Sequence, residues 1–338
     1  MRKKVTIYEI SKEAGVSTCC VSWVLRNHPR SSEVSEKTRR RILDTAEKLG
    51  YHRNQLAAAI RIGKVNTIAV ILNFEKYQSI TSFCQIMAGI MLEASRLGLS
   101  VKVFSDSDLE LAFRQINENL IDQVIMLSVN YQVREQAAEL AEKFSIKLVY
   151  AYERGHRNFP AVNVDNVEIT SRMVHHLAAE GHRRIGLLCV PHQSNYVIDR
   201  HDGFILGMKE CNLTIDPELV HCSDDIENSI KYCMALPGDR RPTAFVALSD
   251  TIAAKVQSYA LRNRLRFPED ISVIGIGDFE ISRMQPFPLT TMGESLLEVG
   301  HLLMTLLRNE AMPMQPDRYN VYHTHAELIR RESVCKLN

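Results

Sequence analysis

Four side chains near the N-terminus have the types and the spacing to contact the edges of DNA bases. They are Thr18, Cys19, Ser22 and Trp23. At a helical period they share the outward face of a short predicted helix. The opposite, apolar face consists of Val21, Val24 and Leu25. Hydroxyl, thiol and indole groups on such a face can form hydrogen bonds and apolar contacts in the major groove.

The preceding residues predict another helix, against which this one can pack. Thr6 followed by Glu9 is a capping box that begins the helix. Gly15 can take the positive φ of a helix end, and Ser17 can cap the helix that follows. The apolar face consists of Ile7, Ile10 and Ala14. Two short helices around a tight turn indicate a helix-turn-helix, although an ordinary surface helical hairpin would show a similar pattern.

The charge of the chain is divided between a basic N-terminal part and an acidic remainder. Residues 1–64 contain 14 Lys and Arg against six Asp and Glu, a net charge of +8. The whole chain carries +1, so the remaining residues carry −7. Lys and Arg side chains on a small domain release counterions from DNA phosphates when they bind. The basic charge of residues 1–64 therefore favours a DNA-binding helix-turn-helix over an ordinary surface hairpin. The run Arg39-Arg40-Arg41 is either a solvated helix face or a further phosphate contact.

Two further segments complete the head and lead to the rest of the chain. Ser35 begins a third predicted helix, which ends at Gly50. Its inner face carries Ile42, Ala46 and Leu49. The alanine-rich segment 51–64, in which Asn54 can cap a brief helix, would be marginal as an isolated helix. Because this segment can fold or melt, we expect it to couple the head to the rest of the chain.

From Thr67 the chain alternates between predicted strands and helices. The strands lie at 67–72, 100–104, 124–128, 147–151, 184–190, 244–248 and 272–276. The helices lie at 83–97, 170–180 and 200–211. Apolar strands that alternate with helices form parallel sheets covered on both faces. We therefore expect an α/β body of two subdomains, each with about five strands, facing a ligand cleft at the carboxyl ends of the strands.

Length and composition exclude several classes of protein. The 338 residues leave room for a small head and roughly two further units. No apolar run approaches the ~20 residues of a membrane helix, and Met1-Arg2-Lys3-Lys4 does not lead into a signal peptide. The eight cysteines show neither a C-x-x-C pair nor metal-ligand spacing, which predicts reduced, mostly structural thiols in a cytoplasmic protein. The adjacent Cys19 and Cys20 could alternatively form a redox switch.

Motifs along nearly the whole chain resemble the lactose-repressor and galactose-repressor family of bacterial transcription factors. In the head the similar motifs are V-T-I-Y-E-I, A-G-V-S, V-S-E-K-T-R-R-R-I at 34–42 and L-G-Y-H-R-N at 49–54. In the body they are V-D-N at 164–166, G-H-R-R-I at 181–185, P-E-D-I-S-V-I-G at 268–275 and P-L-T-T at 288–291. The stretches L-R-N at 25–27 and G-I-G-D-F-E-I at 275–281 are similar to the gluconate branch of that family.

The resemblance implies how the chain is organised. We expect a helix-turn-helix domain at 1–50, a hinge at 51–66 and an effector-binding and dimerisation domain at 67–338. The body of the family resembles periplasmic sugar-binding proteins, in which the chain crosses three times between subdomains. We expect these crossings near Val164, Thr291 and Tyr322. The N-subdomain then comprises about 67–163 and 292–322, and the C-subdomain about 164–291 and 323–338.

The resemblance also implies contacts with double-stranded operator DNA. The expected residues are Thr6, Ser17, Thr18, Cys19, Ser22, Trp23, Asn54, Ala57 and Ile60. The chain departs from the family at Trp23, where a basic residue able to fork onto guanine is commoner. Trp23 can contact a thymine methyl or a sugar, or pack against the head. The loop 27–33 is about three residues longer than usual, Arg53 replaces a proline, and Ile60 stands where a leucine usually wedges into the minor groove.

For the body, the resemblance implies a small-molecule effector in the cleft. Its expected contacts are Ser194, Tyr196, Arg200, Ser249, Asp250, Asp278 and Glu294. Arg200 matches the arginine with which the family grips its ligand, and its fork suits a hydroxyl pair or a carboxylate. The alternative is a surface salt bridge with Asp199 or Asp202. Gly277 stands where many sugar-binding members carry an aspartate, which favours a sugar acid over a neutral sugar.

Other classes of protein fit the sequence less well. A periplasmic sugar-binding protein would share the body but needs an export signal and has no basic head. A nucleotide-dependent enzyme needs phosphate-binding glycines, which we do not find. No Ser/His/Asp constellation appears, and His175-His176 and His323-Thr-His325 lack partners at metal-ligand spacing. We expect a homodimeric repressor that is not an enzyme, with no cofactor or metal, reading a pseudo-palindromic operator.

Overall fold

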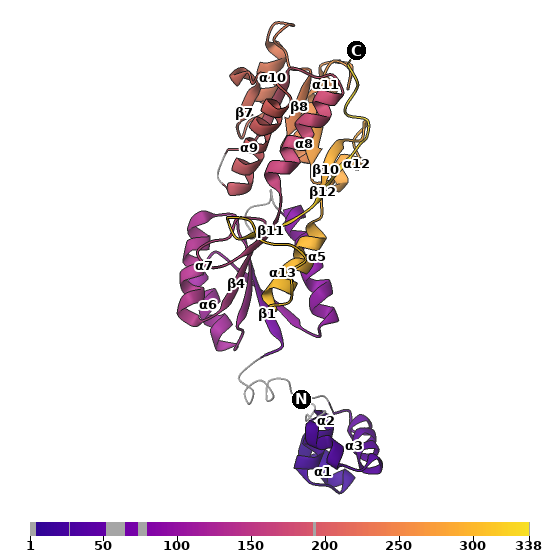
Figure 1. The fold of residues 1–338 in the computed structure, drawn as a ribbon. Coiled ribbons are helices and arrows are strands. Elements are labelled where there is room, and N and C mark those ends of the chain that lie inside the picture. Colours follow the sequence, from indigo (N-terminus) through magenta and orange to yellow (C-terminus); the bar gives the residue numbers. More distant parts are fainter. Residues whose placement is uncertain (1–4, 27, 52–64, 74–79, 192–193, 338) are drawn as a thin grey trace. The chain divides into compact units, whose positions relative to one another are not determined.

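The computed structural model describes residues 5–26, 28–51, 65–73, 80–191 and 194–337 (Figure 1). The chain divides into two compact units, a head that ends at Val65 and a body that begins at Asn66. Each unit buries hydrophobic clusters of its own. Within the described ranges, no helix is long and apolar enough to cross a membrane.

The described residues of the head form three α-helices and one 3-10 helix. They are α1 (Ile7–Ala14), α2 (Thr18–Leu25), the 3-10 helix Pro29–Glu33 and α3 (Glu36–Lys48). Their inner faces bury one apolar cluster, made of Ile10, Ala14, Val21, Val24, Ile42 and Ala46. Helices this short do not hold alone in water, so they fold by burying one another's apolar faces. The predicted helix-turn-helix and the third helix are confirmed.

The predicted signals at the helix ends are present. The Glu9 carboxylate accepts a hydrogen bond from the Thr6 backbone N–H (2.7 Å), as in a capping box. Gly15 ends α1 at a φ of 60°. The Ser17 hydroxyl accepts from the Cys20 N–H (3.2 Å) at the start of α2. Local hydrogen bonds therefore hold the turn between the two helices.

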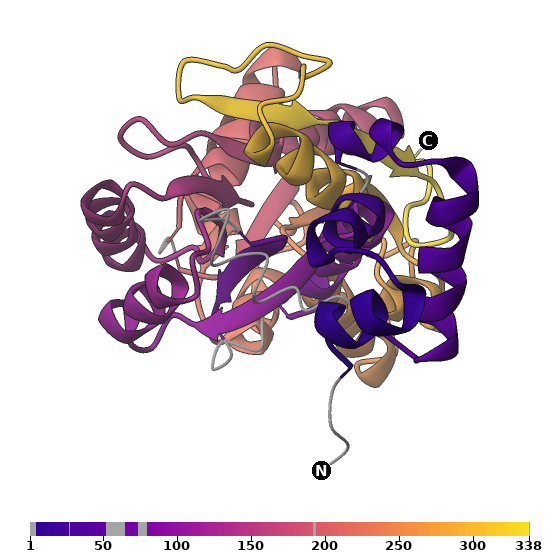
Figure 2. The same cartoon turned by 90° about the horizontal axis from the view of Figure 1, so that it is seen from below.

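The body contains two six-stranded sheets, of which the first is parallel throughout, in the order β11-β5-β4-β3-β1-β2. Its strands are β1 (Thr67–Leu72), β2 (Ser100–Ser105), β3 (Gln123–Leu127), β4 (Lys147–Ala151), β5 (Ala161–Val164) and β11 (Val321–Thr324). Helices cover both faces, with α6 and α7 on one side and α5 and α13 on the other (Figures 1 and 2). The helices are α5 (Ile80–Arg96), α6 (Leu109–Glu118), α7 (Tyr131–Phe144) and α13 (Leu296–Leu307).

The second sheet has the order β12-β10-β9-β8-β6-β7 and is parallel except for β12, which is antiparallel to β10. Its strands are β6 (Ile185–Cys189), β7 (Val220–Cys222), β8 (Ala244–Ala247), β9 (Ser272–Ile276), β10 (Thr290–Glu294) and β12 (Ala326–Ile329). The helices are α8 (Asn166–Ala179), α9 (Asn195–Glu210), the 3-10 helix Pro217–Leu219, α10 (Ile226–Ala235), α11 (Asp250–Arg262) and α12 (Glu280–Arg283). The α/β class with two largely parallel sheets is confirmed. Each sheet has six strands, one more than the approximate number expected.

The chain crosses three times between the sheets. The crossings lie between β5 and α8, between β10 and α13, and between β11 and β12, at residues 165, 295 and 325. The first directly follows Val164. The other two lie a few residues after Thr291 and Tyr322, because β10 and β11 continue through those positions. We call 66–164 with 296–324 the N-subdomain, and 166–294 with 326–337 the C-subdomain.

The prediction of reduced thiols is wrong for one pair of cysteines. Cys189 at the end of β6 forms a disulfide with Cys222 at the end of β7. The parallel register pairs these two residues, and their Cα atoms lie 4.5 Å apart, within the usual range for a disulfide. Their separation of 33 residues conceals a contact that only the strand order creates. Cys19 and Cys20 are both free.

We predict that Gly300→Ala destabilises the body, because α5 and α13 approach each other closely at Gly300. A Cβ at this position would overlap the Ile86 carbonyl oxygen and lie 2.8 Å from the Ile90 nitrogen. Overpacking of a dense contact costs about 1–3 kcal/mol, so urea denaturation should give a free energy of unfolding lower by that amount. Gly238→Ala is the control, since a Cβ there meets open space. Equal stability of the two variants would contradict the prediction.

Candidate DNA-binding face and ligand cleft

The residues predicted to contact DNA lie on α1 and α2 or at their starts. Those that are exposed are Thr6, Ser17 and Cys19, and those that are half-buried are Thr18, Ser22 and Trp23. Thr6 and Ser17 are N-caps, so they lie where free backbone N–H groups favour phosphate oxygens. The predicted hinge contacts Asn54, Ala57 and Ile60 lie outside the described residues.

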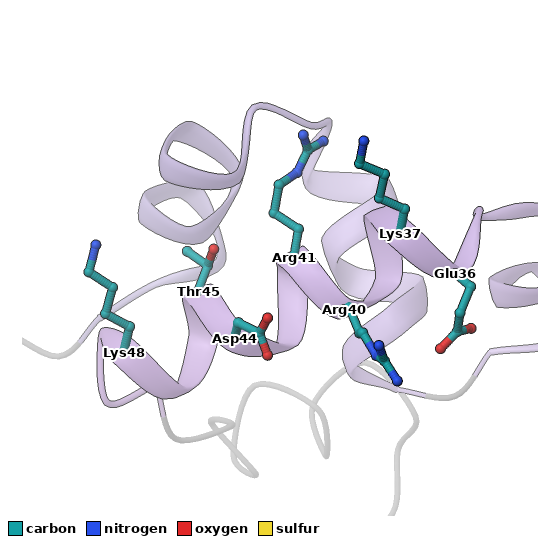
Figure 3. Close-up of a pocket in the computed structure, with 7 residues that line it drawn as sticks. All are labelled: Glu36, Lys37, Arg40, Arg41, Asp44, Thr45 and Lys48. Atoms are coloured by element: carbon teal, nitrogen blue, oxygen red, sulfur yellow. The ribbon is translucent and has the colours of Figure 1, made fainter.

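The exposed side of α3 concentrates cations around an open groove of about 580 Å³. The groove is lined by Glu36, Lys37, Arg40, Arg41, Asp44, Thr45 and Lys48. Figure 3 shows Lys37, Arg41 and Lys48 extending to one side of the helix, with Arg40 and Glu36 on the other. Four cations against two carboxylates attract phosphate. Arg40 and Arg41 belong to the run Arg39-Arg40-Arg41 noted in the sequence, and Lys37 and Lys48 lie on neighbouring turns of α3.

In the body, one buried arginine joins the two subdomains. The Arg200 residue on α9 is 3% exposed. Its Nη2 donates to the Glu294 carboxylate (2.6 Å) and to the Tyr152 hydroxyl (2.9 Å). Tyr152, which follows β4 in the N-subdomain, also donates to Glu294 (2.9 Å). We call these three residues the Arg200 network; it spans the cleft between the subdomains.

The remaining groups of Arg200 are also satisfied. Its Nε donates to the Asn166 side-chain oxygen (2.7 Å), and its Nη1 donates to the Leu248 carbonyl (2.9 Å). The ring centroids of Tyr152 and Tyr196 lie 5.9 and 5.3 Å from the guanidinium carbon. A buried charge is tolerated only when hydrogen bonds and an opposite charge replace its water, which these groups do.

Asp199 and Asp202 are not the partners of Arg200, so the alternative of a surface salt bridge is wrong. Asp199 forms an ion pair with Arg154 of the N-subdomain. The Asp202 carboxylate lies 3.9 Å from the His201 ring. Arg200 itself is buried and pairs with the Glu294 carboxylate at the end of β10.

The segment after β4 makes further contacts across the cleft. Tyr152 has a φ of 62°, which turns the chain sharply at this point. The Glu153 carboxylate then accepts from the backbone N–H of Asn195, the first residue of α9 (3.2 Å). Burial raises the pKa of Glu153, and Arg134, 3.7 Å away, opposes this rise. Together with Arg154, three consecutive residues of the N-subdomain thus hold α9.

Three predicted effector contacts lie at the N-termini of cleft-facing helices. Ser194 is buried and precedes α9, and Tyr196 lies in its first turn with its ring centroid 5.3 Å from that of Tyr152. Ser249 caps α11, where its hydroxyl accepts from the Ile252 N–H (3.3 Å). Because these helices follow the carboxyl ends of parallel strands, their N-termini face the same edge of the sheet.

The two predicted aspartates are engaged within the C-subdomain. The Asp250 carboxylate accepts from the Thr291 hydroxyl (2.6 Å) and from the Phe279 N–H (2.9 Å). Burial raises the pKa of Asp250 to about 6. Asp278 forms an ion pair with Arg331. Both carboxylates hold the loop after β9 against its neighbours and so shape the wall of the cleft.

A polar groove of about 280 Å³ opens beside the Arg200 network at the second crossing. It is lined by Gln85 of the N-subdomain, by Ser295 and, from the C-subdomain, by Gly277, Asp278, Arg283, Gly293, Glu294, Glu327 and Ile329. The groove therefore brings together two of the expected effector contacts, Asp278 and Glu294.

The sequence did not indicate the side chains that the N-subdomain carries at the carboxyl edge of its sheet. Tyr152 follows β4, buried Ser128 follows β3, and Asn73 follows β1 and donates to Asp106 after β2 (2.9 Å). A polar or aromatic residue directly after an apolar strand is the signal that could have found them. Such residues meet because the carboxyl ends of parallel strands share one edge of a sheet.

Two parts of the chain match known families. Residues 6–54 match the bacterial regulatory proteins of the lacI family, and residues 174–334 match the periplasmic binding protein-like domain. The HTH-type transcriptional regulator RegA of Clostridium saccharobutylicum is 27% identical over 341 residues, covering 97% of this chain and 98% of RegA. The HTH-type transcriptional repressor CytR of Escherichia coli K12 is 26% identical over 314 residues, covering 90% and 89%.

Solved structures share the fold over almost the whole chain. The lac repressor dimer bound to operator and the anti-inducer ONPF aligns with a TM-score of 0.80 at 23% identity, covering 98% of this chain and 100% of that one. The complex of the transcriptional regulator CelR with cellobiose aligns with a TM-score of 0.67 at 21% identity and the same coverage. A helix-turn-helix head followed by a periplasmic-binding-protein-like body is therefore the fold of this chain.

We predict that Glu294→Gln destabilises the body, because it leaves the buried Arg200 cation without an opposite charge. Breaking a buried pair in this way costs on the order of 3 kcal/mol, measured as the free energy of unfolding in urea. Glu227→Gln is the matched control, since Glu227 pairs with Arg262 on the surface, where both side chains are about 60% exposed. It should change stability by less than about 1 kcal/mol. A Glu294→Gln effect as small as the control's would show that the pair contributes little.

Proposed function

Because the chain belongs to the lacI family of bacterial regulatory proteins, we propose that it represses transcription by binding operator DNA, under the control of a small carbohydrate-type ligand. One observation carries this proposal: a basic helix-turn-helix head shares a chain with a body whose buried Arg200 network spans a cleft. We assign DNA binding to 1–50, a hinge to 51–66, and effector binding and dimerisation to 67–338. We also propose that the protein acts in the cytoplasm.

On the DNA side, we propose a homodimer whose paired heads read the two halves of a pseudo-palindromic operator. The second helix of each head, α2, enters the major groove with Thr18, Cys19 and Ser22, while the cations of α3 attract phosphates. The hinge segments around Asn54 to Ile60 fold on the operator, and Ile60 wedges into the minor groove. This division gives affinity to the cations and sequence preference to α2.

On the ligand side, the effector acts on the crossings between the subdomains. Arg200 donates to Asn166 just after the first crossing and to Glu294 just before the second. A ligand that replaces one of these bonds changes the relative free energy of two subdomain arrangements. It shifts their populations only by the difference between its affinities for them. DNA affinity and ligand affinity then change by the same factor.

The chemistry of the Arg200 network suits a ligand with several hydroxyl groups. Arg200 and Tyr152 supply donors and Glu294 supplies an acceptor, which together match a pair of sugar hydroxyls. Glu294 already balances the charge of Arg200, so a sugar acid has to displace this carboxylate to bind. The charge balance therefore favours a neutral sugar over the sugar acid expected from the sequence. The cellobiose complex of CelR, a protein with the same fold, agrees with a carbohydrate ligand.

The second candidate function is a sugar-binding protein of the periplasmic type that does not bind DNA. The match of residues 174–334 to a periplasmic binding protein-like domain favours it. The two functions differ in the role of the head.

We predict that removal of residues 1–62 abolishes specific DNA binding and leaves ligand binding unchanged. The full chain is first used to select operator duplexes from a random library, and fluorescence anisotropy then compares both proteins on the selected duplex. We expect specific binding to be lost because the truncation removes both α2, which is proposed to contact bases, and the cations of α3. Specific binding by the truncated body would contradict this assignment. Failure of the full chain to select any sequence would favour the non-DNA-binding alternative.

We predict that neutral sugars raise the melting temperature of the full chain more than sugar acids do. A ligand that binds only the folded state adds ~2.7 kcal/mol at a hundred times its dissociation constant. Thermal denaturation is measured with a panel of sugars, sugar acids and sugar phosphates. Tyr152→Phe should weaken the response, because the hydroxyl that bonds Arg200 and Glu294 is gone. Tyr232→Phe, an exposed tyrosine bonded to Glu218, is the control.

Other outcomes of this panel are equally informative. A response to acids alone would restore the sugar-acid expectation. A response that Tyr152→Phe leaves intact would place the ligand outside the Arg200 network.

A further inference from the structure

Helix α2 contains no charged side chain over its eight residues, T-C-C-V-S-W-V-L. Arginine and lysine make the commonest specific contact with DNA, to the O6 and N7 atoms of guanine. The hydroxyl, thiol and indole groups of α2 cannot form that two-pronged contact. A cation that reads guanine beside α2 must therefore come from a neighbouring segment.

The nearest cation along the chain, Arg26, is turned back onto α2. Its Nε donates to the Ser22 carbonyl oxygen (2.9 Å). Its Nη2 donates to the Ser22 hydroxyl. These two bonds use one edge of the guanidinium to close the end of the helix. Arg26 therefore caps the end of α2, and its guanidinium is less available to contact a DNA base.

Arg30 is different, because the 3-10 helix that carries it holds its guanidinium against an aromatic ring of α2. The guanidinium carbon lies 5.7 Å from the centroid of the Trp23 ring. At this distance a cation is attracted to the face of an indole, which is the best of the aromatic partners. Trp23 lies on the same face of α2 as Cys19 and Ser22, two of the residues expected to contact bases.

Hydrogen bonds fix the backbone of this 3-10 helix to the end of α2. The His28 N–H donates to the Trp23 carbonyl (3.0 Å), and the His28 ring stacks on Trp23 with centroids 6.3 Å apart. The His28 Nδ1 atom accepts from the Arg30 backbone N–H (3.2 Å). Pro29 presets the first residue of the 3-10 helix. Arg30 is thus attached to Trp23 through backbone and side chain together.

The other partner of Arg30 competes only weakly with DNA. Glu33 lies 3.9 Å away, and both side chains are 63% exposed. Exposed pairs of this kind contribute little free energy, so a guanine or a phosphate can replace the carboxylate. The guanidinium lies over the Trp23 ring, and the exposure of the Arg30 side chain leaves its N–H donors accessible.

We propose that Arg30, held on the face of Trp23, reads a guanine next to the bases that α2 contacts. It supplies the two-pronged donor that α2 itself lacks, and Trp23 serves as its positioning residue. The inference rests on the proposed operator binding and names a specificity determinant in the 3-10 helix after α2. Arginine suits this role because its fork matches the guanine edge and its plane stacks on aromatic rings.

The test uses the full chain and the operator that it selects from a random duplex library. Arg30→Ala should lose on the order of ten- to a hundred-fold of the preference for guanine at one position of each half-site. Arg30→Lys should lose the same preference while keeping the salt dependence of binding, because its charge remains. Trp23→Ala should relax that same position. Arg40→Ala, which removes an exposed cation of α3, should leave all base preferences unchanged.

Three outcomes with these variants would overturn the inference and leave operator binding in place. If Arg30→Ala weakens binding equally to all sequences and lowers the salt slope, Arg30 contacts phosphate instead. If Arg30→Ala changes nothing, Arg30 does not contact DNA. If Trp23→Ala relaxes a different base pair from Arg30→Ala, Trp23 contacts DNA on its own. A full chain that selects no sequence at all would overturn operator binding together with this inference.

A second measurement checks the stack without DNA. Trp23 is the single tryptophan of the chain, so its fluorescence reports this site alone. Arg30→Ala should shift the emission of the free protein, with an unchanged circular dichroism spectrum showing that the head is folded. Emission identical to that of the natural chain would show that the guanidinium does not lie on the ring.

Discussion

The arrangement of the body depends on the burial of one positive charge. Arg200 is 3% exposed, and an ion removed from water needs an opposite charge and hydrogen bonds in its place. It finds them in Glu294, Tyr152, Asn166 and the Leu248 carbonyl. These groups come from both subdomains, with Tyr152 before the first crossing, Asn166 directly after it and Glu294 directly before the second. The same interaction that satisfies the charge therefore fixes how the subdomains meet, and any ligand must compete with it.

Parallel sheets explain why these partners can meet. In the C-subdomain, alternate residues of β6 enter separate apolar clusters, with Leu187 in one and Leu188 in the other. Because helices cover both faces, apolar side chains dominate the strands. The residue after β4 lies at the carboxyl edge of the first sheet, and the residues after β8 and at the end of β10 lie at the carboxyl edge of the second sheet. The fold thus places the buried Arg200 network in the cleft, which is where a small ligand can act.

The head has only a very small apolar core with which to hold the exposed face of α2 in a defined orientation. Six buried side chains and the caps at Thr6 and Ser17 fix the orientation of α2. Its outward face is uncharged, whereas the groove of α3 carries four cations. Attraction to DNA and discrimination between bases are thereby placed on different elements, and the acidic body leaves the attraction localised in the head.

Sequence by itself determined the features that rest on contacts within a few residues. The Thr6–Glu9 box, the Gly15 turn and the strands at 67–72, 147–151 and 272–276 were predicted as observed, because periodicity and caps are local properties. The sequence also singled out Arg200 and Glu294, through resemblance, but not that they bond to each other. Only the tertiary structure joined Glu294 to Arg200 and Tyr152, which lie 94 and 142 residues away, and Cys189 to Cys222. Strand order and the three crossings create these contacts, and neither leaves a signal at the residues themselves.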